Sequence, residues 1–175
     1  KMAKNDILKQ IVAKKKERIL LAMQQLNLGD LKAKITGLPA ARPFKEVIGK
    51  PKQISLIAEI KQASPVKGII RQNFNLQEIA HAYQEAGAQA VSVLTEEDFF
   101  GGNPAYINEV KKIFTGPILR KDFILESYQV YESRYLGADA ILLIADLLTK
   151  DKLVEFMRLA DSLGLDYIVE AHDEK

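Results

Sequence analysis

The chain opens with apolar residues at helical spacing. Over residues 5–26 an apolar side chain recurs every three or four positions, with lysines between, and this spacing predicts an amphipathic helix. Asn5 or Asp6 can cap its start, and Gly29 lies just beyond its end. Three residues that interrupt helices mark a linker after it: Gly37, Pro39 and Pro43. A short apolar stretch over residues 44–48 completes the N-terminal segment.

The remainder of the chain repeats one pattern. Short apolar runs, typical of buried strands, cover residues 56–60, 90–94, 117–119, 140–144 and 167–169. Helical patterns between them cover residues 76–86, 104–114, 126–136 and 149–163. Three of the runs follow a glycine that can close a helix in the left-handed conformation: Gly87, Gly137 and Gly164. We therefore expect a helical extension over residues 1–50 and a fold of repeated βα units over residues 51–175.

Nearly all-apolar strands that alternate with helices indicate an α/β fold with a parallel sheet covered by helices. Two architectures fit this pattern: a doubly wound open sheet and a (β/α)8 TIM barrel. The first junction between a strand and a helix lacks the G-x-G-x-x-G fingerprint of dinucleotide-binding sheets. The position of the charges decides between the two architectures.

Charged residues stand at the carboxyl ends of three of the apolar runs. Glu59 and Lys61 are two residues apart, so they share one face of their strand. Lys121 and Glu170 end two further runs. One such side chain can simply be solvated in a loop, but four together favour a barrel mouth, where barrel enzymes place their chemistry. Two lysines and two carboxylates around one pocket suit acid–base catalysis.

Composition excludes several classes of site. The 175 residues are 47% hydrophobic and 27% charged, the balance of a globular protein. The net charge of +2 gives no reason to expect a nucleic-acid partner. The absence of cysteine excludes a disulfide scaffold, a cysteine-based zinc site and a cysteine nucleophile. The two histidines, His81 and His172, are too few for a histidine-rich metal site, and no metal-ligand spacing appears.

The N-terminal segment is rich in lysine and lacks the continuous apolar stretch of a secretory signal. No apolar run approaches the ~18 residues of a membrane span, so we expect a cytoplasmic protein with no membrane partner. The basic residues of this segment cluster together: Lys9, Lys14, Lys15, Lys16 and Arg18. We interpret them as the solvated face of a helix, with a basic patch that attracts an anionic substrate as the alternative.

Several segments resemble the indole-3-glycerol phosphate synthase family. The segments read IAEIKQASPVKG (57–68), VSVLTE (91–96), FFGG (99–102), PILRKDFI (117–124), GADAILLI (137–144) and VEAHD (169–173). The resemblance runs through the whole chain in order and includes the helical extension. Two positions depart from the family pattern: Val66 stands where serine is common, and Ala171 where valine is common.

The resemblance implies a carbon–carbon lyase of tryptophan biosynthesis on a (β/α)8 barrel. The family converts 1-(2-carboxyphenylamino)-1-deoxyribulose 5-phosphate, a sugar phosphate linked to anthranilate, into indole-3-glycerol phosphate. The aromatic carbon attacks the sugar ketone, and carbon dioxide and then water leave. No cofactor is implied.

By position, Lys121 resembles the general acid that protonates the ketone oxygen, and Glu170 resembles the base of the dehydration step. Lys61 resembles the lysine that meets the substrate carboxylate and can serve as a second acid. Glu59 resembles the partner that orients both lysines.

The resemblance also implies substrate-binding residues. Phe100 and Phe123 resemble the walls that hold the anthranilate ring, with ordinary core as the less favoured interpretation of Phe100. Ser64 resembles a residue on the phosphate side, although a serine before Pro65 could equally only form a turn.

The length of the chain is short for a complete barrel, which takes ~250 residues. The sequence stops just after the fifth apolar run, so we expect an incomplete barrel without strands six to eight and without most of the phosphate site. We expect little or no synthase activity from this chain alone, and self-association through open strand edges.

Two alternatives stay open. A different sugar-phosphate barrel enzyme, such as phosphoribosylanthranilate isomerase, is disfavoured because that family works with a cysteine and this chain has none. A non-catalytic folding or assembly fragment of a synthase is not separated from the first hypothesis by composition.

Overall fold

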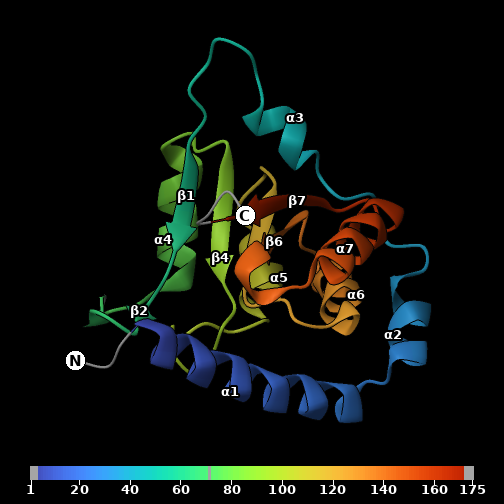
Figure 1. Ribbon diagram of the computed structural model, residues 1–175. Helices are drawn as coiled ribbons and strands as arrows, with labels where there is room; N and C mark the ends of the chain where they lie inside the picture. The colour runs from blue at the N-terminus through green and yellow to red at the C-terminus, as the bar shows by residue number, and fades with distance from the viewer. Residues whose placement is uncertain (1–3, 71, 172–175) are drawn as a thin grey trace.

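The structure is a computed structural model that describes residues 4–70 and 72–171, and a parallel sheet forms its centre (Figure 1). The sheet contains β1 (Ile57–Ile60), β4 (Ala90–Leu94), β5 (Ile118–Lys121), β6 (Ala140–Ile144) and β7 (Asp166–Glu170). Each strand pairs in parallel with the strand that precedes it in this series, in the order β1-β4-β5-β6-β7. The order never reverses, so the sheet lacks the switch point of a doubly wound fold and has the winding of a barrel.

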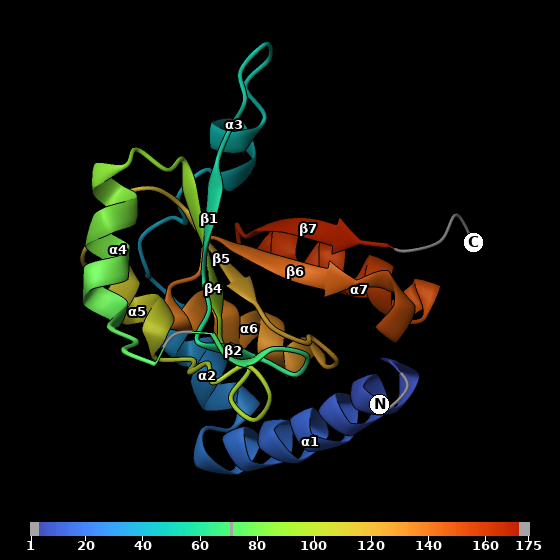
Figure 2. The same ribbon diagram turned by 90° about the vertical axis from the view of Figure 1, so that its left-hand side faces the viewer.

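Helices cover one face of this sheet, as Figure 2 shows. They are α4 (Leu76–Glu85), α5 (Tyr106–Lys111), α6 (Ser127–Leu136) and α7 (Lys150–Ser162). Outward-facing strand residues such as Val93 and Ile118 pack under α4 and α5, and Ile141 and Leu143 pack under α7. The helices predicted between the strands are confirmed, although α5 is shorter than its pattern indicated. Gly137 closes α6 with a φ of 90°.

The N-terminal segment contains a helix that the sequence analysis missed. The predicted first helix is confirmed as α1 (Lys4–Gln25), but it starts early enough to enclose Asn5 and Asp6, so neither caps it. The predicted linker is wrong over α2 (Leu28–Ile35), where Asn27 accepts a hydrogen bond from the Asp30 backbone N–H and starts a new helix. Gly29 lies beyond the end of α1, as predicted, but inside α2.

A third short helix, α3 (Phe44–Ile48), closes the amino ends of the strands. Phe44 is 1% exposed and packs on the inner face of the sheet against Ala90, Leu119 and Ala140. The Asp166 carboxylate accepts a hydrogen bond from the Lys45 backbone N–H at 2.8 Å. The N-terminal segment is thus packed against both ends of the sheet, because α1 lies on the side toward which β1 points (Figure 1).

Two further elements complete the described chain. A small antiparallel hairpin, β2 (Ala63–Ser64) and β3 (Gly68–Ile69), follows β1 on the carboxyl side of the sheet and was not predicted. A single 3-10 turn, η1 (Ala145–Leu147), follows β6. Within residues 4–70 and 72–171, no helix is long and apolar enough to cross a membrane.

Candidate active site

Three of the four predicted charged residues meet at the carboxyl ends of the strands. Glu59 lies on β1, Lys121 lies on β5, and β4 separates the two strands. One carboxylate oxygen of Glu59 lies 2.6 Å from Lys61 Nζ, and the other lies 2.8 Å from Lys121 Nζ. A single carboxylate therefore holds two ammonium groups, one from the residue that follows its own strand and one from across the sheet.

This arrangement keeps Glu59 ionised. Partial burial by itself raises the pKa of the Glu59 carboxyl, but the hydrogen bonds and charges of Lys121 and Lys61 outweigh burial and hold the pKa below its usual range. The carboxylate uses only some of the three donors of each ammonium group. The cluster can therefore present two cationic proton donors to an anionic substrate.

Glu170 occupies the last position of β7, on the same side of the sheet as Lys121. It is in register with Ile144 on β6, and Ile144 shares a face with Ala140, which is in register with Leu119. Leu119 and Lys121 lie two residues apart on β5, so all of these side chains face inward. The strands thus direct Glu170 to the same face and the same end as the lysines. His172 lies outside the described residues.

The two predicted aromatic residues also come together. The rings of Phe100 and Phe123 lie 6.0 Å apart between centroids at an interplanar angle of 41°. Both residues are partly exposed. Glu96, which is fully buried, accepts hydrogen bonds from the backbone N–H groups of Phe99 and Phe100 at 2.7 and 3.0 Å. Glu96 was not among the predicted site residues, although it stands shortly before Phe99 and Phe100 in the sequence.

Ser64 lies in the hairpin after β1. Its hydroxyl accepts a hydrogen bond from the Lys67 backbone N–H at 3.1 Å, which closes the turn between β2 and β3. The neighbouring Ala63 N–H donates to the Phe100 carbonyl at 3.1 Å, so the hairpin is tied to the loop that carries this ring. The hairpin therefore stands at the edge of the lysine cluster.

A buried ion network behind β5 was also missed. Lys15 from α1 lies 2.8 Å from Asp122, and Arg120 lies 3.2 Å from Asp122 and 2.8 Å from Glu132. The interpretation of Lys15 as part of a solvated helix face is wrong, because Lys15 is 3% exposed and faces the barrel. The sequence does carry a signal for this network, which is the alternation of side-chain direction along the strand around Lys121. Because Lys121 faces inward, Arg120 and Asp122 must face the covering helices, where charges need partners.

The other basic residues of α1 fit the solvated-face interpretation better. Lys9, Lys14 and Lys16 are exposed, and Lys14 pairs with Glu17 one turn away. Arg18 donates to both oxygens of Asp98, in the loop after β4.

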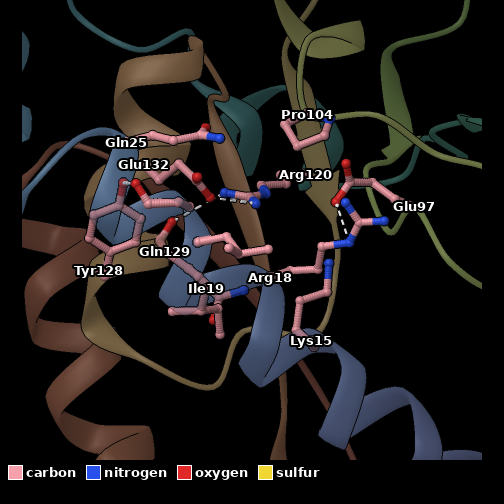
Figure 3. Close-up of a pocket in the computed structure, with 12 residues that line it drawn as sticks. Lys15, Arg18, Ile19, Gln25, Glu97, Pro104, Arg120, Tyr128, Gln129 and Glu132 are labelled. Carbon is pink, nitrogen blue, oxygen red and sulfur yellow. Dashed lines mark hydrogen bonds and ion pairs between the residues drawn. The ribbon is translucent and has the colours of Figure 1, made fainter.

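A cavity of about 320 Å³ lies beside this network, between α1 and α6 (Figure 3). Arg120 and Lys15 line it together with side chains such as Arg18, Tyr128 and Glu132. Since Arg120 faces away from Lys121, this cavity lies behind β5 and is separate from the lysine cluster. In the part of the chain that the structure describes, no group of three or more acidic, histidine or cysteine side chains is placed to hold a metal ion.

Comparisons with known proteins agree on one family. A family model described as indole-3-glycerol phosphate synthase matches residues 8–175. A protein of that name from Desulforamulus reducens is 46% identical over 169 residues, which cover 97% of this chain and 64% of the relative. Its namesake from Clostridium acetobutylicum is 48% identical over 97% of this chain and 64% of the relative. A third, from a Thermoanaerobacter species, is 54% identical over 75% of this chain and 50% of the relative. The chain thus spans less than two thirds of the length of these relatives.

Proposed function

Because this chain belongs to the indole-3-glycerol phosphate synthase family, whose fold is the (β/α)8 barrel, we propose that it supplies the acid and base groups of that synthase. The proposed reaction converts 1-(2-carboxyphenylamino)-1-deoxyribulose 5-phosphate into indole-3-glycerol phosphate, carbon dioxide and water. The observation that carries the proposal is the Glu59 carboxylate, which holds Lys61 at 2.6 Å and Lys121 at 2.8 Å at the mouth of the sheet. Residues 51–175 supply the barrel part of the site, and residues 1–50 form an extension.

The first step closes the ring. The aromatic carbon that bears the carboxylate attacks the ketone carbon, and Lys121 Nζ donates a proton to the ketone oxygen as the new bond forms. Lys61 Nζ pairs with the substrate carboxylate. Glu59 offsets both positive charges before the substrate arrives, which holds the two ammonium groups close together.

The later steps release carbon dioxide and water. Loss of carbon dioxide returns the bonding electrons to the ring. Glu170 then removes a proton from the new ring, and Lys61, as the second acid, donates the proton with which the hydroxyl group leaves as water. Glu170 reaches this position because β7 ends at the same mouth as β5. The base lies two strands away from the acid, with β6 between them, so acid and base can act on different atoms of the substrate.

Binding groups surround this chemistry. The rings of Phe100 and Phe123, at 6.0 Å, form the walls for the anthranilate ring. Ser64 contributes on the phosphate side, where the hairpin places its backbone and hydroxyl next to the loop of Phe100.

The test uses the complete gene product with the proposed substrate. Carbon dioxide and the fluorescent indole product are measured together, and we expect them in equal amounts. In the Glu170→Gln variant, carbon dioxide should appear ahead of the indole product, because dehydration becomes the slow step. Absence of turnover by the unaltered protein would refute the function. Equal slowing of both products in the variant would refute the role of Glu170.

A further inference from the structure

The buried charges of the network behind β5 have several hydrogen-bond partners each. The Arg120 guanidinium donates to Glu132 at 2.8 Å, to Ser133 Oγ at 3.1 Å and to Thr95 Oγ1 at 3.1 Å. Its side chain is 2% exposed, and Figure 3 shows it reaching toward Glu132. Arg120 thus joins β5 to α6 and to the end of β4.

Asp122 is the second centre of this network. One of its carboxylate oxygens lies 2.8 Å from Lys15 Nζ, and the other accepts from Thr95 Oγ1 at 2.6 Å. Its side chain is 0% exposed. Burial by itself raises the pKa of Asp122, but the charges of Arg120 and Lys15 outweigh it, and the pKa lies below its usual range.

Stability alone does not account for such a network. Removing several charges from water costs about as much as their attraction returns, and apolar residues of similar volume often stabilise a core equally well. Separating one partner from a buried ionic group is, however, strongly destabilising, because it leaves an unpaired charge inside the protein. The network therefore fixes the positions of the elements that it joins: α1, β4, β5 and α6.

Two residues of this network lie next to a residue of the proposed site. Arg120 and Asp122 flank Lys121 in the sequence, and their side chains point outward while Lys121 points inward to Glu59. Asp122 also accepts a hydrogen bond from the Phe123 backbone N–H at 2.8 Å. The Asp122 carboxylate thus holds the Arg120 side chain on one side of the proposed acid and the backbone N–H of the proposed ring wall on the other.

We propose that Asp122 is a positioning residue that holds Lys121 and Phe123 in the geometry in which the ammonium group and the aromatic ring meet the substrate together. The inference rests on the proposed function. Lys15 extends the same control to α1, because it locks this helix onto the carboxylate that sets the end of β5.

Asp139 offers a matched control for a test on the complete gene product. Its side chain is also 0% exposed, and it pairs with Lys111 at 2.7 Å. It lies just before β6 and accepts from the Ile118 N–H at the opposite end of β5, so Asp139→Asn removes an equally buried charge that is bonded to the same strand far from Lys121. We expect Asp122→Asn to lower kcat/KM at least tenfold more than Asp139→Asn, after correction for the folded fraction.

A second readout separates positioning from loss of structure. The charged groups that share the inner face near Glu59 are Lys61 just after β1, Lys121 at the end of β5 and Glu170 at the end of β7. If Asp122→Asn displaces Lys121, the pKa of Glu59, followed by carboxylate NMR, rises toward the ordinary value of about 4.3. Asp139→Asn should leave it unchanged. Thr95→Val removes one hydroxyl between Arg120 and Asp122, and it should raise the pKa of Glu59 by less. This variant replaces Asp122→Asn in the test if Asp122→Asn does not fold.

Equal losses of kcat/KM in the two aspartate variants, with Glu59 titrating as in the unaltered protein, would overturn the inference. That outcome leaves the proposed function intact if Lys121→Met is inactive. Full activity of Lys121→Met would instead overturn the role of Lys121, and absence of turnover by the unaltered protein would overturn the function itself.

Discussion

Replacement of Glu59 by glutamine tests the centre of the site. The amide keeps the shape of the side chain but removes the charge that holds Lys61 at 2.6 Å and Lys121 at 2.8 Å. Without that charge, two ammonium groups repel each other across the mouth of the sheet. We expect them to separate, and the proposed acid then lies out of line with the ketone oxygen.

The size of the effect follows from exposure. The Glu59 side chain is 29% exposed and that of Lys121 is 38% exposed, so solvent screens both contacts. Each contact is then worth about 0.5–1 kcal/mol, and the pair about 1–2 kcal/mol. If the loss falls on the transition state, kcat/KM drops about 5- to 30-fold, since 1.36 kcal/mol corresponds to a factor of ten.

The assay measures kcat and KM of the complete gene product from the indole fluorescence of its product. Glu85→Gln on α4, which neutralises an exposed carboxylate away from the site, is the control and should match the unaltered protein. A change of less than twofold in kcat/KM for Glu59→Gln would refute the reasoning.

Unfolding supplies an independent check on the same variant. The pKa of Glu59 is lowered in the folded state, so its contribution to the free energy of unfolding is present above about pH 4.3 and is lost as the pH falls through the folded value. The stability gap between the unaltered protein and Glu59→Gln should therefore close in acid. A gap that stays constant down to the lowest accessible pH would contradict this assignment of the charge.

Three further predictions concern the sheet. Phe44→Ala should lower the free energy of unfolding by about 3–5 kcal/mol in denaturant titrations, because Phe44 fills the amino end of the inner face; a loss under 1 kcal/mol would contradict this. Ser92→Ala should leave stability unchanged or slightly raised, since the buried Ser92 hydroxyl has no partner among the described residues; a loss above 2 kcal/mol would count against it. A polypeptide of residues 1–175 made alone should self-associate through its edge strands β1 and β7, and a monomer at high concentration in sedimentation would oppose this.

Much of the fold follows from local pattern. The strand over residues 140–144 was predicted with its observed bounds, because an unbroken apolar run after a helix-closing glycine leaves few alternatives. The helix α2 was missed because glycine and proline around it indicated a linker. Its formation depends on Asn27 as a cap and on Leu31, which is fully buried by packing that a linear sequence does not display.

The candidate site, too, could be predicted only in part from the sequence. Glu59 and Lys121 could be grouped from the sequence because parallel strands bring their carboxyl ends to one edge. The link between Lys15 and Asp122 could not, because it joins residues more than a hundred positions apart and depends on where α1 docks. The inward or outward direction of Arg120 was predictable from alternation, but the identity of its partners was not.

The most direct measurement compares turnover of the complete gene product with that of its Lys121→Met variant, with Lys112→Met on the exposed surface as the control. If Lys121 is the proton donor to the ketone oxygen, the variant should form indole-3-glycerol phosphate at least about a hundredfold more slowly, because general acid catalysis contributes that much or more. The control should keep full activity. Product formation by Lys121→Met at the rate of the unaltered protein would contradict the account.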